Sequence, residues 1–203
     1  MIRAVIFDLD GVLFDGCEFH ANIFMEALWT VLGKSALTKE HHDAHLNGLS
    51  TKKKLEVLGI GKEDSQKISY LKQELTRTKI RDYIHPDLKV QEICKTLLGK
   101  GITIYCVSNS IRETILRCLE GMGVLDVLSG IISNEDVKEP KPSPEPYLTL
   151  FQKHGLVPEE CLIVEDSEHG LESARKSGGH VLSVANCESL TLEKILERLN
   201  NVK

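Results

Sequence analysis

The stretch VIFDLDGVLFD, residues 5–15, leads an apolar run directly into three aspartates, Asp8, Asp10 and Asp15. Continuous apolar and β-branched character over residues 3–7 predicts a strand that is buried on both faces. Side chains two residues apart on an extended chain point to the same side, so Asp8 and Asp10 would do so if the extended conformation continued. Because two carboxylates on one side repel each other, we expect a positive group between them.

The composition is that of a globular protein. The 203 residues are 41 % hydrophobic and 27 % charged, the net charge is −5, and the basic residues are scattered in short groups. This distribution predicts no nucleic-acid surface. No apolar run approaches the roughly 18 residues of a membrane span, and no basic segment typical of a signal peptide follows Met1. The six cysteines lie far apart without Cys-x-x-Cys spacing, which predicts reduced thiols and a cytoplasmic location.

Apolar segments that alternate with helical patterns follow in the second half of the chain. The expected strands are residues 102–107, 129–132, 161–164 and 180–184, and the expected helices are residues 111–121, 144–154, 168–177 and 189–200. This alternation predicts an α/β fold in which a doubly wound parallel sheet carries helices on both faces.

The long interval between the first two expected strands, from residue 15 to about 88, shows helical periodicity and no convincing strand. It exceeds the roughly dozen residues that one crossover needs, so it predicts an inserted helical module with Asp15 at its hinge. The expected domains are a core of residues 1–14 and 87–203 and a cap of residues 15–86. A module on two short linkers at the carboxyl edge of a sheet is placed to act as a lid.

Polar residues follow four of the expected strands, and the carboxyl ends of parallel strands form one edge where sites collect. In chain order they are Asp8 and Asp10, then Ser108-Asn109-Ser110, then Lys141 within KEPKP, and then Glu165-Asp166. We therefore expect these side chains to meet at one site.

The three aspartates among these residues, Asp8, Asp10 and Asp166, supply the hard oxygen ligands that Mg²⁺ prefers. The cation would also offset the repulsion between Asp8 and Asp10. A carboxylate beside such a cation can attack phosphorus, and a second carboxyl two residues further on can protonate the leaving oxygen. We therefore predict Asp8 as the nucleophile and Asp10 as the general acid and base.

The remaining polar residues suit a transferring phosphate, whose charge spreads over its equatorial oxygens. Ser108 offers a hydroxyl, Asn109 a backbone N–H near a helix start, and Lys141 an ammonium group held between two prolines. As an alternative, Ser108 and Asn109 could cap the helix that begins near Ile111. Glu165 would point away from Asp166 if the strand geometry continued, and it is a candidate for a metal ligand or for a supporting group behind the ligands.

These motifs resemble those of the haloacid dehalogenase-like superfamily, in its β-phosphoglucomutase and small sugar-phosphate phosphatase branch. In order along the chain they are Asp8-Leu9-Asp10-Gly11, Ser108, Lys141 in KPSPEPY, and VEDSEHGLESARKSG. The resemblance covers the whole chain and implies a Rossmann-like core with a C1-type helical cap. It also implies a phosphorylated Asp8, an Asp10 that acts as acid and base and gives Mg²⁺ its backbone carbonyl, and Asp166 as the third protein ligand. In this branch a histidine of the first cap helix can face the active site, here His20, although a half-buried helix histidine is the alternative.

The sequence thus predicts an Mg²⁺-dependent phosphatase that hydrolyses a small phosphorylated metabolite, such as a sugar or polyol phosphate. The alternative is a phosphosugar mutase with the same phosphoryl chemistry. Gly16-Cys17, Ser110 and Thr51 depart from the pattern of that mutase, which has Thr-Ala in the first place and an arginine in the last. A third hypothesis is a binding protein that keeps the fold without catalysis. Nothing in the sequence predicts the oligomeric state or the cap residues that set specificity.

Overall fold

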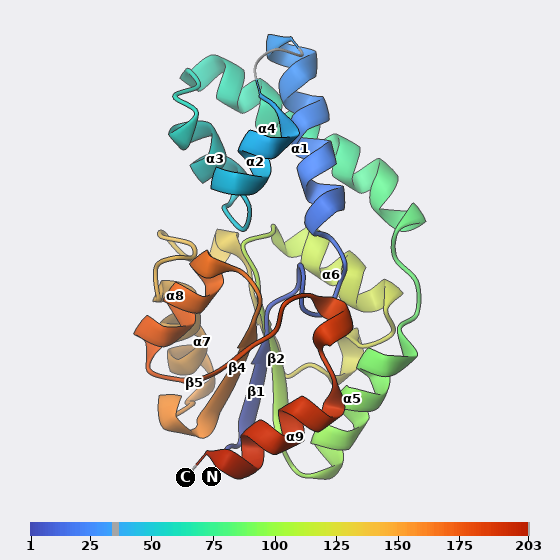
Figure 1. The fold of residues 1–203 in the computed structure, drawn as a ribbon, viewed down its shortest axis with the longest axis vertical. Helices are drawn as coiled ribbons and strands as arrows, with labels where there is room; N and C mark the ends of the chain where they lie inside the picture. The colour runs from blue at the N-terminus through green and yellow to red at the C-terminus, as the bar shows by residue number, and fades with distance from the viewer. Residues whose placement is uncertain (34–36, 203) are drawn as a thin grey trace. The chain divides into compact units, whose positions relative to one another are not determined.

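The computed structural model describes residues 1–33 and 37–202, and their strands form one parallel five-stranded sheet in the order β3-β2-β1-β4-β5 (Figure 1). The strands are β1 (Ala4–Phe7), β2 (Thr103–Val107), β3 (Gly130–Ile132), β4 (Cys161–Glu165) and β5 (His180–Ser183). Each predicted strand is found to within one residue at either end. The central position of β1, between β2 and β4, follows because the chain adds strands first on one side of β1 and then on the other.

Helices cover both faces of the sheet, which confirms the predicted doubly wound α/β fold. They are α5 (Leu88–Gly99), α6 (Arg112–Gly121), α7 (Glu145–His154), α8 (Glu168–Ser177) and α9 (Leu192–Asn201). Figure 1 shows α7 and α8 on one side of β1, and α5 on the other. Ala4 and Ile6 share a core cluster with residues of α7 and α8. The alternate residues Val5 and Phe7 are also fully buried, so both faces of β1 are covered.

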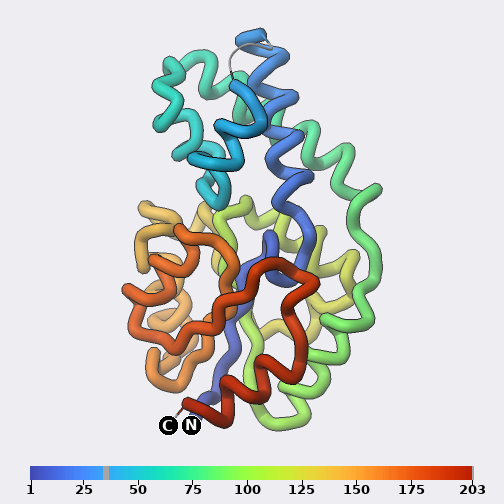
Figure 2. Tube along the Cα trace, viewed as in Figure 1, coloured from blue at the N-terminus to red at the C-terminus, as the bar shows by residue number. Residues whose placement is uncertain are grey.

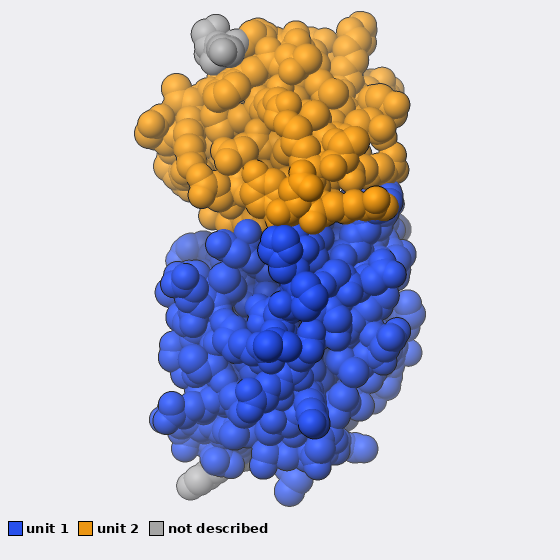
Figure 3. Space-filling model, turned by 90° about the vertical axis from the view of Figure 1, so that its right-hand side faces the viewer, with its two compact units in different colours: residues 1–15, 84–203 blue, residues 16–83 orange. Residues whose placement is uncertain are grey.

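The chain forms two compact units, residues 1–15 with 84–203 and residues 16–83 (Figure 3). The second unit is one continuous insertion between β1 and α5, as the tube in Figure 2 shows. It is built from α1 (Cys17–Leu32), α2 (Lys39–His45), α3 (Thr51–Val57), α4 (Lys62–Lys79) and the 3₁₀ turn η2 (Ile80–Asp82). Its described residues form no strand, as expected of a helical insertion.

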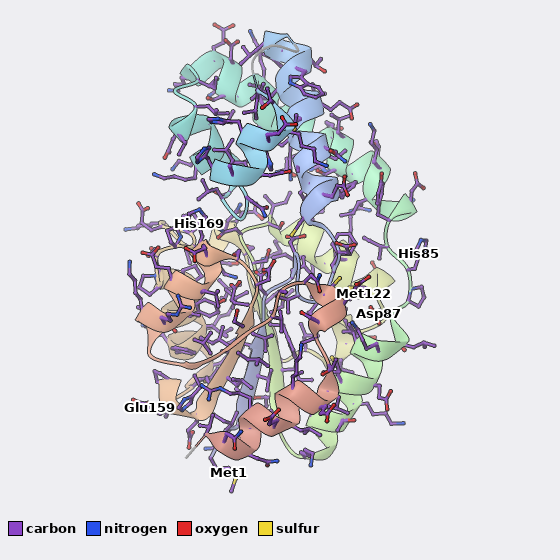
Figure 4. The ribbon with its side chains drawn as sticks, viewed as in Figure 1. Met1, His85, Asp87, Met122, Glu159 and His169 are labelled. Carbon is purple, nitrogen blue, oxygen red and sulfur yellow. The ribbon has the colours of Figure 1, made fainter. Side chains whose placement is uncertain are left out.

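A separate apolar core holds the second unit together, with Phe24 and Leu28 of α1 packed against Leu46 and Ile68. The first unit resumes at Ile84, and Asp87 fixes the start of α5. The Asp87 side chain accepts a hydrogen bond from the backbone N–H of Val90 at 3.0 Å. The backbone N–H of Asp87 also donates to the carbonyl of Met122 at 3.3 Å, and Figure 4 shows these two residues side by side.

Short 3₁₀ turns complete the first unit: η3 (Leu125–Val127), η4 (Asn134–Asp136), η5 (Pro158–Glu160) and η6 (Cys187–Ser189). All six cysteines are free thiols, as the sequence predicts. Within residues 1–33 and 37–202, no helix combines the length and the apolar character needed to cross a lipid bilayer.

Candidate active site

The parallel register brings the residues that follow β1, β2 and β4 to the same edge of the sheet. Phe7 lies opposite Cys106 on one side and Val164 on the other. The next residue, Asp8, donates its backbone N–H to the carbonyl of Val164 at 3.0 Å. Asp8 therefore lies between the segments that contain Ser108 and Glu165, and all the site residues described below, except His20, belong to the first unit.

The strand ends at Phe7, and a tight turn over residues 9–14 follows. The carbonyl of Leu9 accepts hydrogen bonds from Leu13 at 3.0 Å and Phe14 at 2.8 Å, and Gly11 adopts a positive φ of 91° that glycine tolerates without strain. The turn begins at Leu9, so the extended conformation that would place Asp8 and Asp10 on one side does not continue from Asp8 to Asp10. The two carboxylates have different surroundings, because Asp8 is buried and Asp10 is partly exposed.

Lys141 supplies the positive group beside Asp8, and its side chain is only 3 % exposed. Nζ donates to Asp8 Oδ1 at 2.6 Å, to Glu165 Oε1 at 2.5 Å and to the carbonyl oxygen of Val107 at 2.7 Å. An ammonium group has three N–H donors, so these three oxygens occupy all of them. The structure thus brings the predicted Lys141 and Asp8 together, with Lys141 held by protein oxygens alone.

The electrostatics of the group reflect several carboxylates in little water. Burial raises the pKa of Asp8 well above its usual value; Lys141 opposes this shift, and the charges of Glu165, Asp10 and Asp166 add to it. Burial and then the charge of Glu165 raise the pKa of Asp166 to about 6. Burial alone would lower the pKa of Lys141, but the ion pairs with Asp8 and Glu165 raise it above its usual value. The group therefore holds more negative charge than Lys141 alone neutralises.

Asn109 holds the main chain of Lys141. Its side-chain Oδ1 accepts from the backbone N–H of Lys141 at 3.0 Å, and its Nδ2 donates to the backbone carbonyl of Lys141 at 3.1 Å. The alternative prediction that Ser108 or Asn109 caps the following helix is wrong, because Ile111 occupies the N-cap position of α6. The Asn109 side chain instead holds the loop that contains Lys141.

Ser110 connects the second strand end with Asp10. The Ser110 hydroxyl donates to Asp10 Oδ2 at 3.0 Å, while the Ser110 backbone N–H donates to the hydroxyl oxygen of Ser108 at 3.0 Å. Ser108 is 3 % exposed. These bonds orient Asp10 and Ser108 from one residue, Ser110, which follows the second strand as expected.

Glu165 lies in the centre of the site and is fully buried. Besides Lys141, the phenol of Tyr147 on α7 donates to its Oε1 at 2.7 Å. Burial raises the pKa of Tyr147 well above its usual value, so the phenol stays a donor. Gly170 leaves the space that the Glu165 carboxylate fills, because a Cβ atom there would lie 2.0 Å from Oε2. Sequence reasoning missed Tyr147 and Gly170, although a glycine inside the helix predicted for residues 168–177 was a usable sign of close packing.

Three acidic side chains could hold a metal ion. Asp8, Glu165 and Asp166 each offer an oxygen, and the three oxygens lie within 4.8 Å of one another. Asp166 Oδ1 is buried and has no hydrogen-bond donor within the described residues. A buried acceptor without a donor, in a group with excess negative charge, fits a hard divalent cation, which prefers such oxygens. Asp8 and Asp166 meet as predicted, Glu165 joins them, and the Asp10 carboxylate lies outside the group.

His20 belongs to α1 of the second unit, where its ring lies 5.1 Å from that of Phe19 in an edge-to-face arrangement. The half-buried character expected of an ordinary helix histidine agrees with its intermediate exposure. Its predicted role at the active site stays a prediction.

The fold and these side chains define a class of proteins: α/β enzymes with a carboxylate and lysine site at the carboxyl edge of a parallel sheet. Residues 5–184 match the family model described as haloacid dehalogenase-like hydrolase, and the chain belongs to this family.

Several relatives agree with this assignment. The chain is 27 % identical over 195 residues to a β-phosphoglucomutase from Bacillus subtilis, covering 90 % of this chain and 83 % of that protein. It is 28 % identical over 193 residues to a phosphoglycolate phosphatase from Nitrosospira multiformis, with 90 % and 83 % covered. The crystal structure of a β-phosphoglucomutase from Clostridium difficile shares the fold, with a TM-score of 0.79, 21 % identity and 98 % of both chains covered.

Proposed function

We propose that the protein is an Mg²⁺-dependent phosphatase that hydrolyses a small phosphate monoester through an aspartyl phosphate on Asp8. The observation that carries the proposal is the buried Asp8, which accepts from Lys141 at 2.6 Å and shares a group of oxygens with Glu165 and Asp166. It is supported by membership of the hydrolase family and by relatives that are phosphatases by name.

In the first step an oxygen of the Asp8 carboxylate attacks phosphorus, and the bond from phosphorus to the ester oxygen breaks. Asp10 gives its proton to that leaving oxygen, so the alcohol departs neutral. In the second step Asp10 takes a proton from a water molecule, whose oxygen attacks phosphorus. The bond between phosphorus and the Asp8 oxygen breaks, which regenerates the Asp8 carboxylate and releases inorganic phosphate. The hydrogen bond from Ser110 to Asp10 Oδ2 at 3.0 Å would hold this acid and base in place.

Lys141, Ser108 and Asn109 support the reaction in different ways. The ammonium of Lys141 aligns Asp8 and places positive charge beside the transferring group. The hydroxyl oxygen of Ser108 accepts from the Ser110 backbone, which leaves its proton to donate to a phosphate oxygen. Asn109 holds the main chain of Lys141 with two hydrogen bonds, and we propose that its backbone N–H also binds phosphate.

Asp8 and Asp166 would hold Mg²⁺ through their carboxylates, together with the backbone carbonyl of Asp10, and Glu165 is the further acidic candidate. When bound, the cation would neutralise charge that develops on the phosphoryl oxygens. The pKa of Asp166, raised to about 6, means that a proton competes with the cation in mildly acidic solution.

We further propose that the second unit, residues 16–83, is the cap that selects the substrate, with His20 as a substrate-facing residue. A closing cap favours a small molecule such as a sugar or polyol phosphate over a folded phosphoprotein. The six free cysteines are consistent with a reaction in the cytoplasm.

The test is the release of phosphate from p-nitrophenyl phosphate with and without Mg²⁺. We expect turnover that requires Mg²⁺ and is abolished in Asp8→Asn, with Asp126→Asn, an exposed aspartate on η3, as the matched control. No turnover on this ester or on a broad panel of phosphorylated metabolites would favour a binding protein that keeps the fold.

A phosphosugar mutase is the second candidate, favoured by the relatives that are β-phosphoglucomutases by name. Phosphorus NMR with β-glucose 1-phosphate separates the two activities. A phosphatase releases inorganic phosphate, whereas glucose 6-phosphate formed without free phosphate would establish the mutase and overturn our proposal.

A further inference from the structure

Tyr147 and Lys141 both donate to the same oxygen of Glu165. The phenol oxygen of Tyr147 lies 2.7 Å and Nζ of Lys141 lies 2.5 Å from Oε1. An ionised carboxylate has about four lone-pair directions, two on each oxygen. Two donors at these distances therefore fill both directions of Oε1.

The other oxygen, Oε2, is in a different situation. Its hydrogen bond from the backbone N–H of Asp166 is long, at 3.3 Å. Gly170 lies against the carboxylate on one side and leaves no room for it to move in that direction, since even a Cβ there would lie within 2.0–2.3 Å of the carboxylate carbon and both oxygens. Oε2 is therefore the oxygen of Glu165 that keeps a lone pair to share, whereas both lone-pair directions of Oε1 are filled.

Packing alone does not account for the phenol oxygen. Tyr147 is fully buried in the core cluster, and its ring lies 5.1 Å from Nζ of Lys141 in a cation–π arrangement. A phenylalanine would keep both the ring packing and this contact. A buried hydroxyl costs free energy unless it is hydrogen-bonded, and the bond to Glu165 is what satisfies it here.

We infer that Tyr147 is a positioning residue that sets the metal preference of the site, by restricting Glu165 to one ligand oxygen. This inference rests on the proposed metal site at Asp8, Glu165 and Asp166. Mg²⁺ requires a regular octahedron and binds carboxylates through single oxygens, whereas Ca²⁺ takes 6–8 ligands and accepts a carboxylate through both oxygens. Tyr147 therefore disfavours Ca²⁺ by withholding Oε1.

The test is calorimetric titration of the metal-free protein with MgCl₂ and with CaCl₂, so that binding is measured apart from activity. In Tyr147→Phe one lone pair of Oε1 becomes free, and we expect the affinity for Ca²⁺ relative to Mg²⁺ to rise about tenfold, the scale of one hydrogen bond to a charged acceptor.

Tyr105→Phe is the matched control. Tyr105 is a buried tyrosine of the same core cluster, on β2 rather than on α7. We expect its affinity ratio to equal that of the wild type. In a Glu165→Gln background, where the amide has a single acceptor oxygen, Tyr147→Phe should leave the ratio unchanged.

The outcomes separate this inference from the proposed function. If the wild type binds neither cation, the proposed metal site is wrong. If the wild type binds Mg²⁺ but Tyr147→Phe keeps the wild-type ratio, the metal site stands and the role of Tyr147 is wrong. A lower melting temperature of Tyr147→Phe with an unchanged ratio would show that the hydroxyl serves stability alone.

Discussion

Replacing Gly170 with alanine tests the close packing around Glu165. Alanine in place of glycine inside a helix usually stabilises a protein by about 0.5–1 kcal/mol. At Gly170 the new Cβ would lie 2.0 Å from Oε2 and 2.2 Å from Cδ of Glu165, whereas real Cβ contacts essentially never fall under 3.0 Å. The carboxylate must therefore shift by roughly 1 Å, which disturbs its hydrogen bonds from Lys141 at 2.5 Å and Tyr147 at 2.7 Å.

Overpacking typically costs about 1–3 kcal/mol, and a weakened hydrogen bond to a charged group costs about 1.5–3 kcal/mol. We expect Gly170→Ala to lose about 2–4 kcal/mol of unfolding free energy in urea denaturation. Phosphate release should fall at least about tenfold because Lys141 loses one of the oxygens that align it.

Gly99→Ala is the matched control, since Gly99 is also helical and a Cβ there meets nothing within 4 Å. It should gain up to about 1 kcal/mol and keep full activity. A Gly170→Ala variant that behaves in the same way would refute the argument that Glu165 is fixed by close packing.

Three other perturbations have definite expected outcomes. Asn109→Ala removes both hydrogen bonds to the main chain of the site lysine, so kcat should fall about tenfold or more while KM changes less; an unchanged kcat would show that the loop holds itself. Asp166→Asn removes a carboxylate whose pKa is raised to about 6, so the metal-free protein should melt at a higher temperature at pH 7.5. The wild type should gain about 2.7 kcal/mol from Mg²⁺ at 100 times its Kd, fading below pH of about 6, and the variant should gain nothing; equal gains would exclude Asp166 as a ligand. Burial raises the pKa of Asp136, but hydrogen bonds from Ser133 and Arg112 outweigh burial and lower this pKa below its usual value of 3.8. Asp136 therefore stabilises the fold fully above pH 3.8, and this stabilisation is lost as the pH falls through the lower pKa of the folded state. The stability difference between wild type and Asp136→Asn should therefore shrink in acid, and a constant difference would contradict the ion pair.

Much of the fold could be predicted from the sequence, because the spacing of apolar residues indicates each helix and strand and the alternation of strands with helices indicates a parallel sheet. Buried parallel strands have continuous apolar runs, and the polar residues that end them must meet because the register of neighbouring strands is fixed. This is how Asp8, Ser108 and Glu165 are expected at one edge before any coordinates are known. The prediction that Asp8 and Asp10 share a side depended on an extended chain, and the turn after Phe7 ends that conformation.

The side-chain bonds of the site were harder to predict. The bond from Tyr147 to Glu165 joins residues on α7 and β4, and its formation depends on how far the helix lies from the sheet, which no local pattern determines. The two bonds from Asn109 to Lys141 likewise span two loops. Asn109 is a residue type that caps helices, and local propensity alone favoured that role until the start of α6 was known.

The central claim is that Asp8 carries the phosphoryl group during turnover. The most direct measurement uses an ester that the enzyme hydrolyses. The reaction with Mg²⁺ present is quenched with acid during turnover, and the peptides of the enzyme are analysed by mass spectrometry. We predict one added phosphoryl group on the peptide that contains Asp8, absent in Asp8→Asn and present in Asp126→Asn. Full turnover with no phosphorylated peptide, or with the phosphoryl group on another residue, would contradict the account.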